Sequence, residues 1–320
     1  MISVVRFTEE YKGQWNRFNA ACKNPLFMFD RGFMDYHSDR FMDHSLLFFE
    51  DGELIAILPM SEKAGILTSH GGLTYGGFLT GVSMKQHTMN DCFTALMAYA
   101  GEAGFEKIVY KTVPHIYHTQ PAEEDRYALF LHNAWVVKVE ASTVVNLREP
   151  LKMPKGRKAQ VSRARREGVV IRELTEPADF ERFIALENQV LAQRHGTKAV
   201  HTGGELTLLH SRFPEQIRLV GALLGEELIA GTLLFVYGQT VHTQYMAANE
   251  TARQIGALDL TISTVLKACQ GTKLWLDFGI STEEAGRYLN EGLIAQKEGF
   301  GGRTVVYETY ELDTAGERKL

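Results

Sequence analysis

The stretch of residues 273–303, KLWLDFGISTEEAGRYLNEGLIAQKEGFGGR, decides the fold. It opens with alternating apolar residues and reaches Asp277 just before Gly279, which predicts a strand that stops at the glycine. Ser281 or Thr282 can cap a following helix, because two glutamates come next and carboxylates suit the positive end of a helix. A strand that ends in an acid and leads into a helix predicts one edge of a functional site.

The predicted helix carries an apolar row at helical spacing from Ala285 to Leu293, with Tyr288 on an adjoining row. It ends near Lys297, beside the glycine-rich turn EGFGG. Alternation from Thr304 to Leu312 then predicts a closing strand. The lysine and the glycine turn extend the predicted site edge, since glycine lets a ligand approach the backbone.

Two predicted β-hairpins repeat one plan along the chain. They cover residues 46–60 and 218–237, and each is followed by a predicted helix and a further strand. Glu53–Ala56 and Glu227–Ala230 read ELIA letter for letter, in the same place after the hairpin turn. The shared order of elements predicts an internal duplication.

The duplication divides the chain into three predicted parts. An N-terminal domain covers residues 1–150, a basic connecting helix covers 151–172, and a C-terminal domain covers 173–320. The closing strand could belong to the second domain or be shared with the first. Because no low-complexity linker separates the copies, we expect two domains packed together.

Composition limits the protein class. The 320 residues are 45% hydrophobic and 23% charged, as in an ordinary globular protein, and the length suits two domains. We expect no membrane span and no secretion signal, and therefore a cytoplasmic protein. The three cysteines are too scattered for a disulfide framework or a zinc site. The net charge of −5 argues against a protein that coats nucleic acid, although one local basic patch is compatible with it.

Common catalytic signatures are missing from the sequence. It has no Walker loop, no G-x-G-x-x-G, no G-x-S-x-G and no H-E-x-x-H motif. His115 and His118 have a spacing that can bind metal on a helix, but Pro114 and Pro121 predict a loop there. We therefore expect a structural or substrate-orienting role for these histidines and no metal site.

Five stretches resemble the FemAB-like acyltransferases, which are built from tandem domains of the GNAT type. They are DFGIS at Asp277–Ser281, the run Gly286–Arg303, the Tyr-Gly-Gly turn at Tyr75–Gly77, KTVPHIYHTQP at Lys111–Pro121, and the basic run Arg157–Val169. The five stretches are spread from Tyr75 to Arg303 and so span most of the chain. The resemblance implies an α/β fold of two tandem GNAT-like (acyl-CoA N-acyltransferase) domains.

The resemblance also implies a reaction. It is transfer of an acyl or aminoacyl group to an amine of a cell-envelope or sugar-linked acceptor, such as a peptidoglycan precursor. No cofactor is tightly bound, and acyl-CoA or aminoacyl-tRNA serves as co-substrate. We expect direct attack by the acceptor amine, because no cysteine or serine lies in a nucleophile motif.

GNAT-type folds resemble one another in binding the donor between a splayed strand and the start of the next helix. Here that position holds Arg253, Gln254, Gly256 and Ala257, a partial match to the family loop R/Q-x-x-G-x-G/A. Leu258 replaces the final small residue of that loop. The first copy has no such loop, so we expect the second domain to bind the donor and the first to shape the acceptor site.

Three residues are candidates for catalysis. A lysine at the place of Lys297 lies by the acyl donor in FemAB-like transferases, where it can stabilise negative charge; the alternative is a lysine that favours the helix end. Asp277 could orient the amine or act as a base, or else cap the next turn. Tyr245 and Gln244 flank the donor strand, and alternation lets only one of them face the site.

Four further residues are predicted to bind substrate. Tyr75 lies in its glycine turn, and Lys111 and Tyr117 match the family loop. Tyr288 on the late helix could bind substrate or belong to the core.

The basic connecting stretch, residues 152–172, has two interpretations. Its eight bases against one acid could read phosphates of a charged tRNA, or they could pair with acids of this acidic protein. A third possibility for the whole chain lies outside the enzyme class. The partial donor loop also fits a non-catalytic binding or regulatory module.

Overall fold

The computed structural model describes residues 1–314, and within that range it leaves out the side chains of Arg194 and His195. The chain forms two compact units. Unit 1 comprises residues 1–140, 283–288 and 306 onward, and unit 2 comprises residues 141–282 and 289–305. The chain therefore passes between units inside β9 (Trp135–Asn146) and again inside β17 (Arg303–Asp313).

Unit 2 alternates helices with long strands. Its elements are α5 (Lys155–Arg166), β10 (Val170–Leu174), α6 (Pro177–His195), α7 (Gly203–Arg212), β11 (Ile217–Leu224), β12 (Glu227–Val236), β13 (Thr240–Ala248), α8 (Glu250–Ile255), α9 (Ala257–Cys269), β14 (Trp275–Ile280) and α10 (Glu291–Glu298). The strand order is β10-β11-β12-β13-β14, followed by the second half of β9. Only β13 and β14 pair in parallel; the other neighbours are antiparallel.

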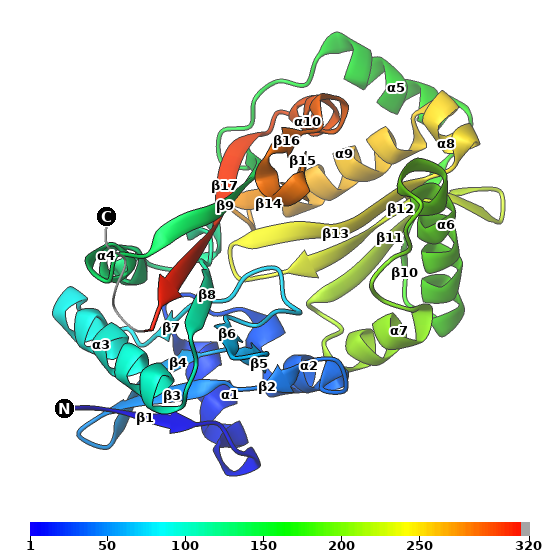
Figure 1. Ribbon diagram of the computed structural model, residues 1–320. Helices are drawn as coiled ribbons and strands as arrows, with labels where there is room; N and C mark the ends of the chain where they lie inside the picture. Colours follow the sequence, from blue (N-terminus) through cyan, green and yellow to red (C-terminus); the bar gives the residue numbers. More distant parts are fainter. Residues whose placement is uncertain (315–320) are drawn as a thin grey trace. The chain divides into compact units, whose positions relative to one another are not determined.

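Helices cover both faces of the unit 2 sheet. In Figure 1, α9 lies over one face of β12 and β13, and α6 lies over the other. The α9 face buries an apolar cluster that includes Ile262, Val265 and Leu276. On the α6 face, Phe183 packs against Gly231, where an added Cβ would lie 3.2 Å from its ring. A sheet with apolar residues on both faces needs this double cover.

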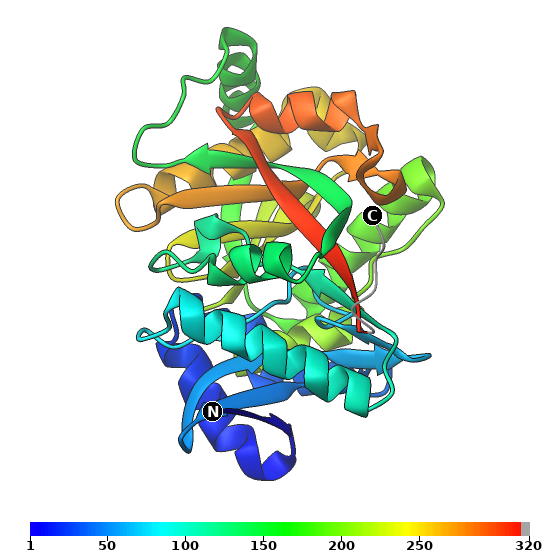
Figure 2. The same cartoon turned by 60° about the vertical axis from the view of Figure 1, so that its left-hand side comes forward.

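Unit 1 has shorter strands. Its elements are β1 (Ile2–Arg6), α1 (Lys12–Ala21), α2 (Arg31–Met34), β2 (Met42–Asp43), β3 (Leu46–Glu50), β4 (Glu53–Leu58), β5 (Ser61–Lys63), β6 (Ile66–Thr68), β7 (Leu79–Thr80), α3 (Gln86–Glu102), β8 (Lys107–Lys111) and α4 (Glu124–Leu131). One sheet has the order β1-β3-β4-β7, and a second runs from β17 through β8, β6 and β5 to β2. Figure 2 shows α3 lying along the strands of the first sheet.

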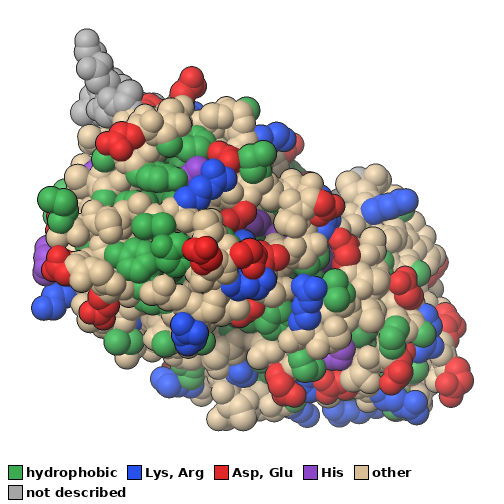
Figure 3. Space-filling model, turned by 90° about the horizontal axis from the view of Figure 1, so that it is seen from below, with side chains coloured by type: hydrophobic (Ala, Val, Ile, Leu, Met, Phe, Trp, Pro, Cys, Tyr) green, Lys and Arg blue, Asp and Glu red, His purple; other side chains and the backbone are tan. Residues whose placement is uncertain are grey.

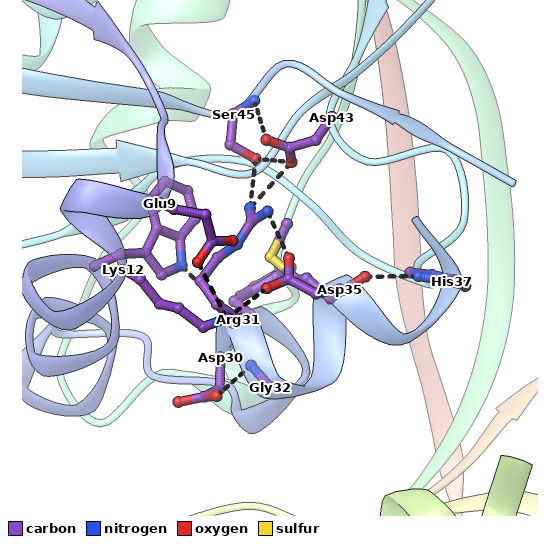
Figure 4. A network of polar contacts seen from close by, with 12 residues as sticks. Glu9, Lys12, Asp30, Arg31, Gly32, Asp35, His37, Asp43 and Ser45 are labelled. Carbon is purple, nitrogen blue, oxygen red and sulfur yellow. Dashed lines mark hydrogen bonds and ion pairs between the residues drawn. The ribbon is translucent and has the colours of Figure 1, made fainter. Parts of the chain in front are cut away.

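A buried ionic cluster ties the N-terminal part of unit 1 together (Figure 4). Arg31 pairs with Asp35 at 2.6 Å and with Asp43 at 3.0 Å, and its guanidinium lies 3.9 Å above the centre of the Phe7 ring. Ser45 also accepts a hydrogen bond from Arg31 and donates one to Asp43. The charge of Arg31 is therefore balanced inside the protein, although its Nε has no partner among the described residues.

The two predicted hairpins are real, and their shared ELIA letters mark the same local structure. In unit 1 the β3–β4 pairing slips so that Ile55 falls outside the register. In unit 2 the β11–β12 pairing slips in the same way at Ile229. Both isoleucines occupy the third position of ELIA and form a β-bulge. A common bulge at a common letter supports the predicted duplication more strongly than sequence identity alone.

The predicted helix that starts at Ser281 or Thr282 is wrong in its first half. The chain instead forms β15 (Thr282–Glu283), a 3-10 turn (Glu284–Gly286) and β16 (Tyr288–Leu289) before α10 begins. Glu284 and Ala285 have φ of 51° and 53°, which a right-handed helix excludes. The helix is capped eight to nine residues later than predicted, by the Asn290 side chain, which accepts a hydrogen bond from the Leu293 N–H at 3.0 Å.

The compact units differ from the predicted domain ranges. Unit 2 begins at Ala141 rather than after a separate connecting helix, because α5 packs on α9. Val161 and Ala164 of α5 are buried in the same cluster as Leu260 of α9. The closing strand enters unit 1 from Val306.

Candidate active site

The strands β13 and β14 separate part-way along their length. They pair only from Thr240 opposite Trp275 to His242 opposite Asp277, and β13 then continues to Ala248 paired with β12 but not with β14. Parallel strands that diverge expose backbone groups between them. The opening is the splayed strand predicted for the second copy.

A β-bulge lies at the start of the opening. Leu233 of β12 faces Tyr245, whereas Leu234 faces Thr243, so the register skips Gln244. A bulge shifts side-chain alternation by one residue. Consequently Tyr245 points to the α6 side, where it meets His201, while Met246 packs toward Leu258 of α9.

A cavity of about 270 Å³ adjoins the opening within unit 2. Its lining comes from five elements: Val190, Met246, Ala248, Ala252, Arg253, Leu258, Asp259, Leu293 and Gln296. Arg253 donates a hydrogen bond to the Ala248 carbonyl at 2.7 Å. Asp259 at the start of α9 is paired with Arg157 at 2.5 Å, which offsets its negative charge. A mostly apolar cavity with a cation and a helix start can hold an acyl chain and an anionic group.

The predicted donor loop is largely closed. Arg253 and Gln254 lie inside α8, whose residues bond within the helix, rather than in an open loop. Gly256 has a φ of 79°, and an added Cβ would lie 2.7 Å from the Gln160 carbonyl of α5. Gly256 and Ala257 are thus buried under α5, and Arg253 alone of these four lines the cavity. The sequence pattern did not show that α5 covers this glycine.

Asp277 is fully buried and holds three hydrogen bonds. Its carboxylate accepts from Ser142 Oγ at 2.5 Å, from the Gly279 N–H at 2.9 Å, and contacts His242 Nδ1 at 3.0 Å. The turn-capping alternative is therefore present in the structure. A carboxylate this well satisfied orients its neighbours, and His242 is the one that lies beside the opening.

Lys297 is buried, with 4% of its surface exposed, and lies at the end of α10. Its Nζ donates to the carbonyls of Gly279 at 3.0 Å and Ile280 at 2.6 Å. Desolvation lowers the pKa of Lys297 to about 8, against a smaller opposing effect of Asp277. The lysine thus fastens α10 to the end of β14, next to the cavity residue Gln296.

Tyr245 belongs to a polar group that sequence reasoning found only in part. Its hydroxyl lies 2.7 Å from His201 Nδ1, and burial raises the pKa of Tyr245. Glu187 of α6 acts on the same tyrosine electrostatically. Sequence analysis missed Glu187, yet a signal was present: it follows Phe183 and Ile184 at the helical spacing of the buried row.

The predicted substrate residues of unit 1 come together, but in its core. The hydroxyls of Tyr75 and Tyr117 are 2.5 Å apart, and that of Tyr307 lies 3.3 Å from Tyr75. Tyr75 and Tyr117 are almost completely buried. Lys111 donates to the carbonyls of His70 and Leu73, and desolvation lowers its pKa to about 7. These contacts hold the loop that precedes β7.

Tyr288 lies in neither a helix nor a core. It is 52% exposed on the two-residue strand β16, in the segment of unit 1 that precedes α10. Its predicted position on a helix is wrong, because the left-handed turn before it prevents helix formation.

Most cations of the basic stretch that leads into and along α5 are exposed and make no ion pair with the described residues. Six cations make no ion pair with any residue in the described range: Lys152, Lys155, Lys158, Arg163, Arg165 and Arg166. Arg157 alone in this helix pairs, with Asp259. By contrast, the face in Figure 3 mixes acids and bases. The prediction that the α5 arginines pair with acids is therefore wrong for all but Arg157.

Within residues 1–314, no cluster of three or more His, Cys, Asp or Glu has a metal-binding arrangement. His118 is buried, and desolvation lowers its pKa to about 4. Among the described helices, none is long and apolar enough to cross a membrane.

Comparison with known proteins agrees with this geometry. Residues 155–288 match the model of the acetyltransferase (GNAT) domain. Similar solved structures include FemX, at 11% identity over 97% of each chain with a TM-score of 0.66. A tandem GNAT protein from the clavulanic acid biosynthesis pathway has 11% identity over 98% of this chain and 99% of that one, with a TM-score of 0.55. L-PGS from Bacillus licheniformis has 14% identity over 87% of this chain and 85% of that one, with a TM-score of 0.59.

At these identities the structural likeness shows the fold. The chain has the α/β tandem-GNAT fold of FemX, and the FemAB-like resemblance is confirmed at that level. No curated protein matches the sequence.

Proposed function

We propose that this protein, which has the FemAB-like tandem-GNAT fold and a GNAT domain in unit 2, is an N-acyltransferase that binds its acyl donor in unit 2. The observation that carries the proposal is the opening between β13 and β14, with a bulge at its start and a cavity beside it. In this proposal acyl-CoA is a co-substrate that leaves after each turnover, and no cofactor is tightly bound.

The chemistry assigned to the opening is direct acyl transfer. Because the register skips Gln244, its backbone N–H can polarise the thioester carbonyl and stabilise the oxyanion. Arg253 and the start of α9 supply positive charge for a phosphate group at the cavity. The amine attacks without a covalent enzyme intermediate, since burial raises the pKa of all three cysteines, to about 12 for Cys22 and Cys92 and above its usual value for Cys269.

The proposed acceptor is an amine linked to the cell envelope or to a sugar, such as a peptidoglycan precursor. The support is the fold shared with FemX and with L-PGS, and the FemAB-like motifs. The acceptor roles of Tyr75, Lys111, Tyr117 and Tyr288 stay predictions. So do the catalytic roles of Lys297, Asp277 and Tyr245.

A second donor, aminoacyl-tRNA, is favoured by one observation. Six unpaired cations lie in and just before α5, which packs against the helix whose start borders the cavity. A row of unpaired exposed cations suits a phosphate backbone. The closed donor loop also removes part of the backbone cradle that coenzyme A would use.

Thermal melts separate the two donors. The protein is melted with acetyl-CoA, longer acyl-CoAs or charged tRNA, beside Arg253→Gln and a triple Arg163, Arg165, Arg166→Gln variant. A ligand at about 100 times its Kd adds about 2.7 kcal/mol of stability. Acyl-CoA predicts a shift lost only in Arg253→Gln; tRNA predicts a salt-sensitive shift lost only in the triple variant. Each variant is the control for the other.

Free-thiol release in the presence of amines then tests turnover. Binding of acyl-CoA without any thiol release would favour a non-catalytic binding module. Absence of a shift with either donor would contradict the proposal.

A further inference from the structure

Glu187 occupies a position that an apolar residue normally takes. It lies on the inward row of α6 after Phe180, Phe183 and Ile184, all of them buried against the sheet. Only 6% of Glu187 is exposed, and its Oε2 has no hydrogen-bond partner among the described residues. Burial raises the pKa of Glu187 to about 7.

The other acids buried in unit 2 are satisfied. Asp179 caps α6 and binds Arg182, and Asp277 holds three partners. Both carboxylates thus offset the cost of losing water. Glu187 differs from them, and an unpartnered buried carboxylate is a site that a cation would complete.

Glu187 lies next to the cavity and the opening. Val190, one helical turn further along α6, lines the cavity, as does Met246, the residue after Tyr245. The charge of Glu187 contributes to the raised pKa of Tyr245, and the Tyr245 hydroxyl forms a hydrogen bond with His201 Nδ1. The carboxylate therefore lies on the α6 side of β13, beside Tyr245 and one helical turn from the cavity residue Val190.

We propose that Glu187 binds the acceptor amine as its ammonium ion and then takes a proton from it. This inference rests on the proposed acyl transfer. The ammonium gives one proton to the carboxylate, and the neutral amine attacks the thioester carbonyl to form the C–N bond. As the intermediate collapses, the C–S bond breaks, the nitrogen loses its second proton and the thiolate gains one. Glu187 returns its proton to water. His201 and Tyr245 are positioning residues beside it.

Several titratable groups lie on the elements packed against α6. They are His242 and Tyr245 on β13, His201 ahead of α7, Glu227 on β12, and Glu205, His210 and Arg212 on α7. A pH profile must therefore be assigned by substitution, and Glu187→Gln keeps the shape of the side chain while removing its ionisation.

The first measurement is thiol release from acetyl-CoA with glucosamine, ethanolamine and lysine between pH 6 and 9. Wild-type kcat/KM is expected to rise with pH, with a midpoint near 7. In Glu187→Gln, kcat/KM is expected to fall by about 100-fold or more, and its rise near pH 7 is expected to disappear. Glu181→Gln, an exposed glutamate on the same helix, is the control. A Glu187→Gln enzyme that keeps the rate and the limb would overturn the inference while leaving the proposed function.

The second measurement needs no turnover. The carboxyl carbons of the glutamates are labelled with ¹³C, and the Glu187 signal is identified by its absence in Glu187→Gln. Butylammonium chloride is expected to lower the Glu187 titration midpoint, and butanol to leave it unchanged. If butylammonium leaves the titration midpoint of Glu187 unchanged, the inference is overturned, whether or not the protein transfers acyl groups. An effect without transfer to any amine would support the ammonium site and count against the proposed function.

Discussion

The two units begin alike and diverge at one strand. Each has a hairpin with a bulge at the third letter of ELIA. In unit 2 the next strand, β13, runs for nine residues, carries a second bulge and separates from β14. In unit 1 the strand that follows β4 in the sheet, β7, has two residues and pairs with β4 alone. The scaffold thus occurs twice, and within residues 1–314 only the copy with the long strand has an opening between its strands.

What fills the equivalent place in unit 1 explains the difference. Tyr110 of β8 is fully buried, accepts a hydrogen bond from the Phe78 N–H at 2.7 Å and donates one to Asp125 at 2.7 Å. Its ring packs with those of Phe78 and Phe93. An aromatic core with a satisfied hydroxyl therefore occupies the gap beside β7. At this place unit 1 is closed by packing, whereas unit 2 keeps a cavity; the cavity of about 670 Å³ in unit 1 lies elsewhere, between residues 38–42 and 62–65.

The same contrast holds for buried charge. In unit 1 Arg31 is surrounded by Asp35, Asp43 and the Phe7 ring. In unit 2 Glu187 is buried without a hydrogen-bond partner for Oε2 among the described residues. A buried paired charge serves stability or specificity, whereas a buried unpaired charge costs stability and is tolerated for function. The difference can be tested by removing each charge.

Removing the paired charge is expected to have the largest effect. Arg31→Met removes the cation that Asp35 and Asp43 share and leaves only Lys12 beside Asp35, so the free energy of unfolding should fall by about 3 kcal/mol. Urea unfolding measures the change. The control is Arg218→Met, because Arg218 pairs with Glu173 at the surface and both are more than 40% exposed. In Arg218→Met the free energy of unfolding should fall by less than about 1 kcal/mol. Equal losses in Arg31→Met and Arg218→Met would mean that burial does not strengthen the stabilisation by the Arg31 ion pairs.

Removing the unpaired charge is expected to stabilise the protein, with a dependence on pH. The pKa of Glu187 is about 7 in the folded protein against 4.5 normally. Below pH 4.5 both states are protonated and the group costs nothing. Between pH 4.5 and 7 the group ionises in the unfolded state but stays protonated in the folded one, so its cost to stability grows to about 3 kcal/mol and is constant above pH 7. Glu187→Gln should therefore melt close to wild type at pH 4.5 and clearly higher at pH 8. A difference independent of pH would contradict the unpaired charge.

Sequence reasoning succeeded where structure is local. The hairpins and the helix 257–269 follow from alternation, turn residues and periodicity. It failed where contacts with segments distant in the sequence determine the local structure. The left-handed turn at Glu284 and Ala285 broke a helix that periodicity favoured. Gln160 of α5 packs against Gly256 and closes the loop that the sequence predicted to bind the donor.

The candidate site was predicted only in part for the same reason. Tyr245 was named, but the bulge at Gln244 decides which face it takes, and alternation carries no sign of that shift. Glu187 was missed because a glutamate on a helix is usually exposed, and its burial depends on packing of α6 against β13.

The smallest expected effect on stability comes from two lysines, Lys297, which is buried, and Lys111, which is partly buried, and this pair separates a structural role from a catalytic one. Lys297 in unit 2 and Lys111 in unit 1 each donate to two backbone carbonyls. Replacing either by Met should cost about 2 kcal/mol, because two carbonyls lose a donor. If Lys297 also stabilises negative charge on the donor, Lys297→Met should lower kcat at least tenfold. Lys111→Met should leave kcat close to wild type and act on KM for the acceptor, if at all. Equal kcat in the two variants would limit Lys297 to fastening α10 to β14.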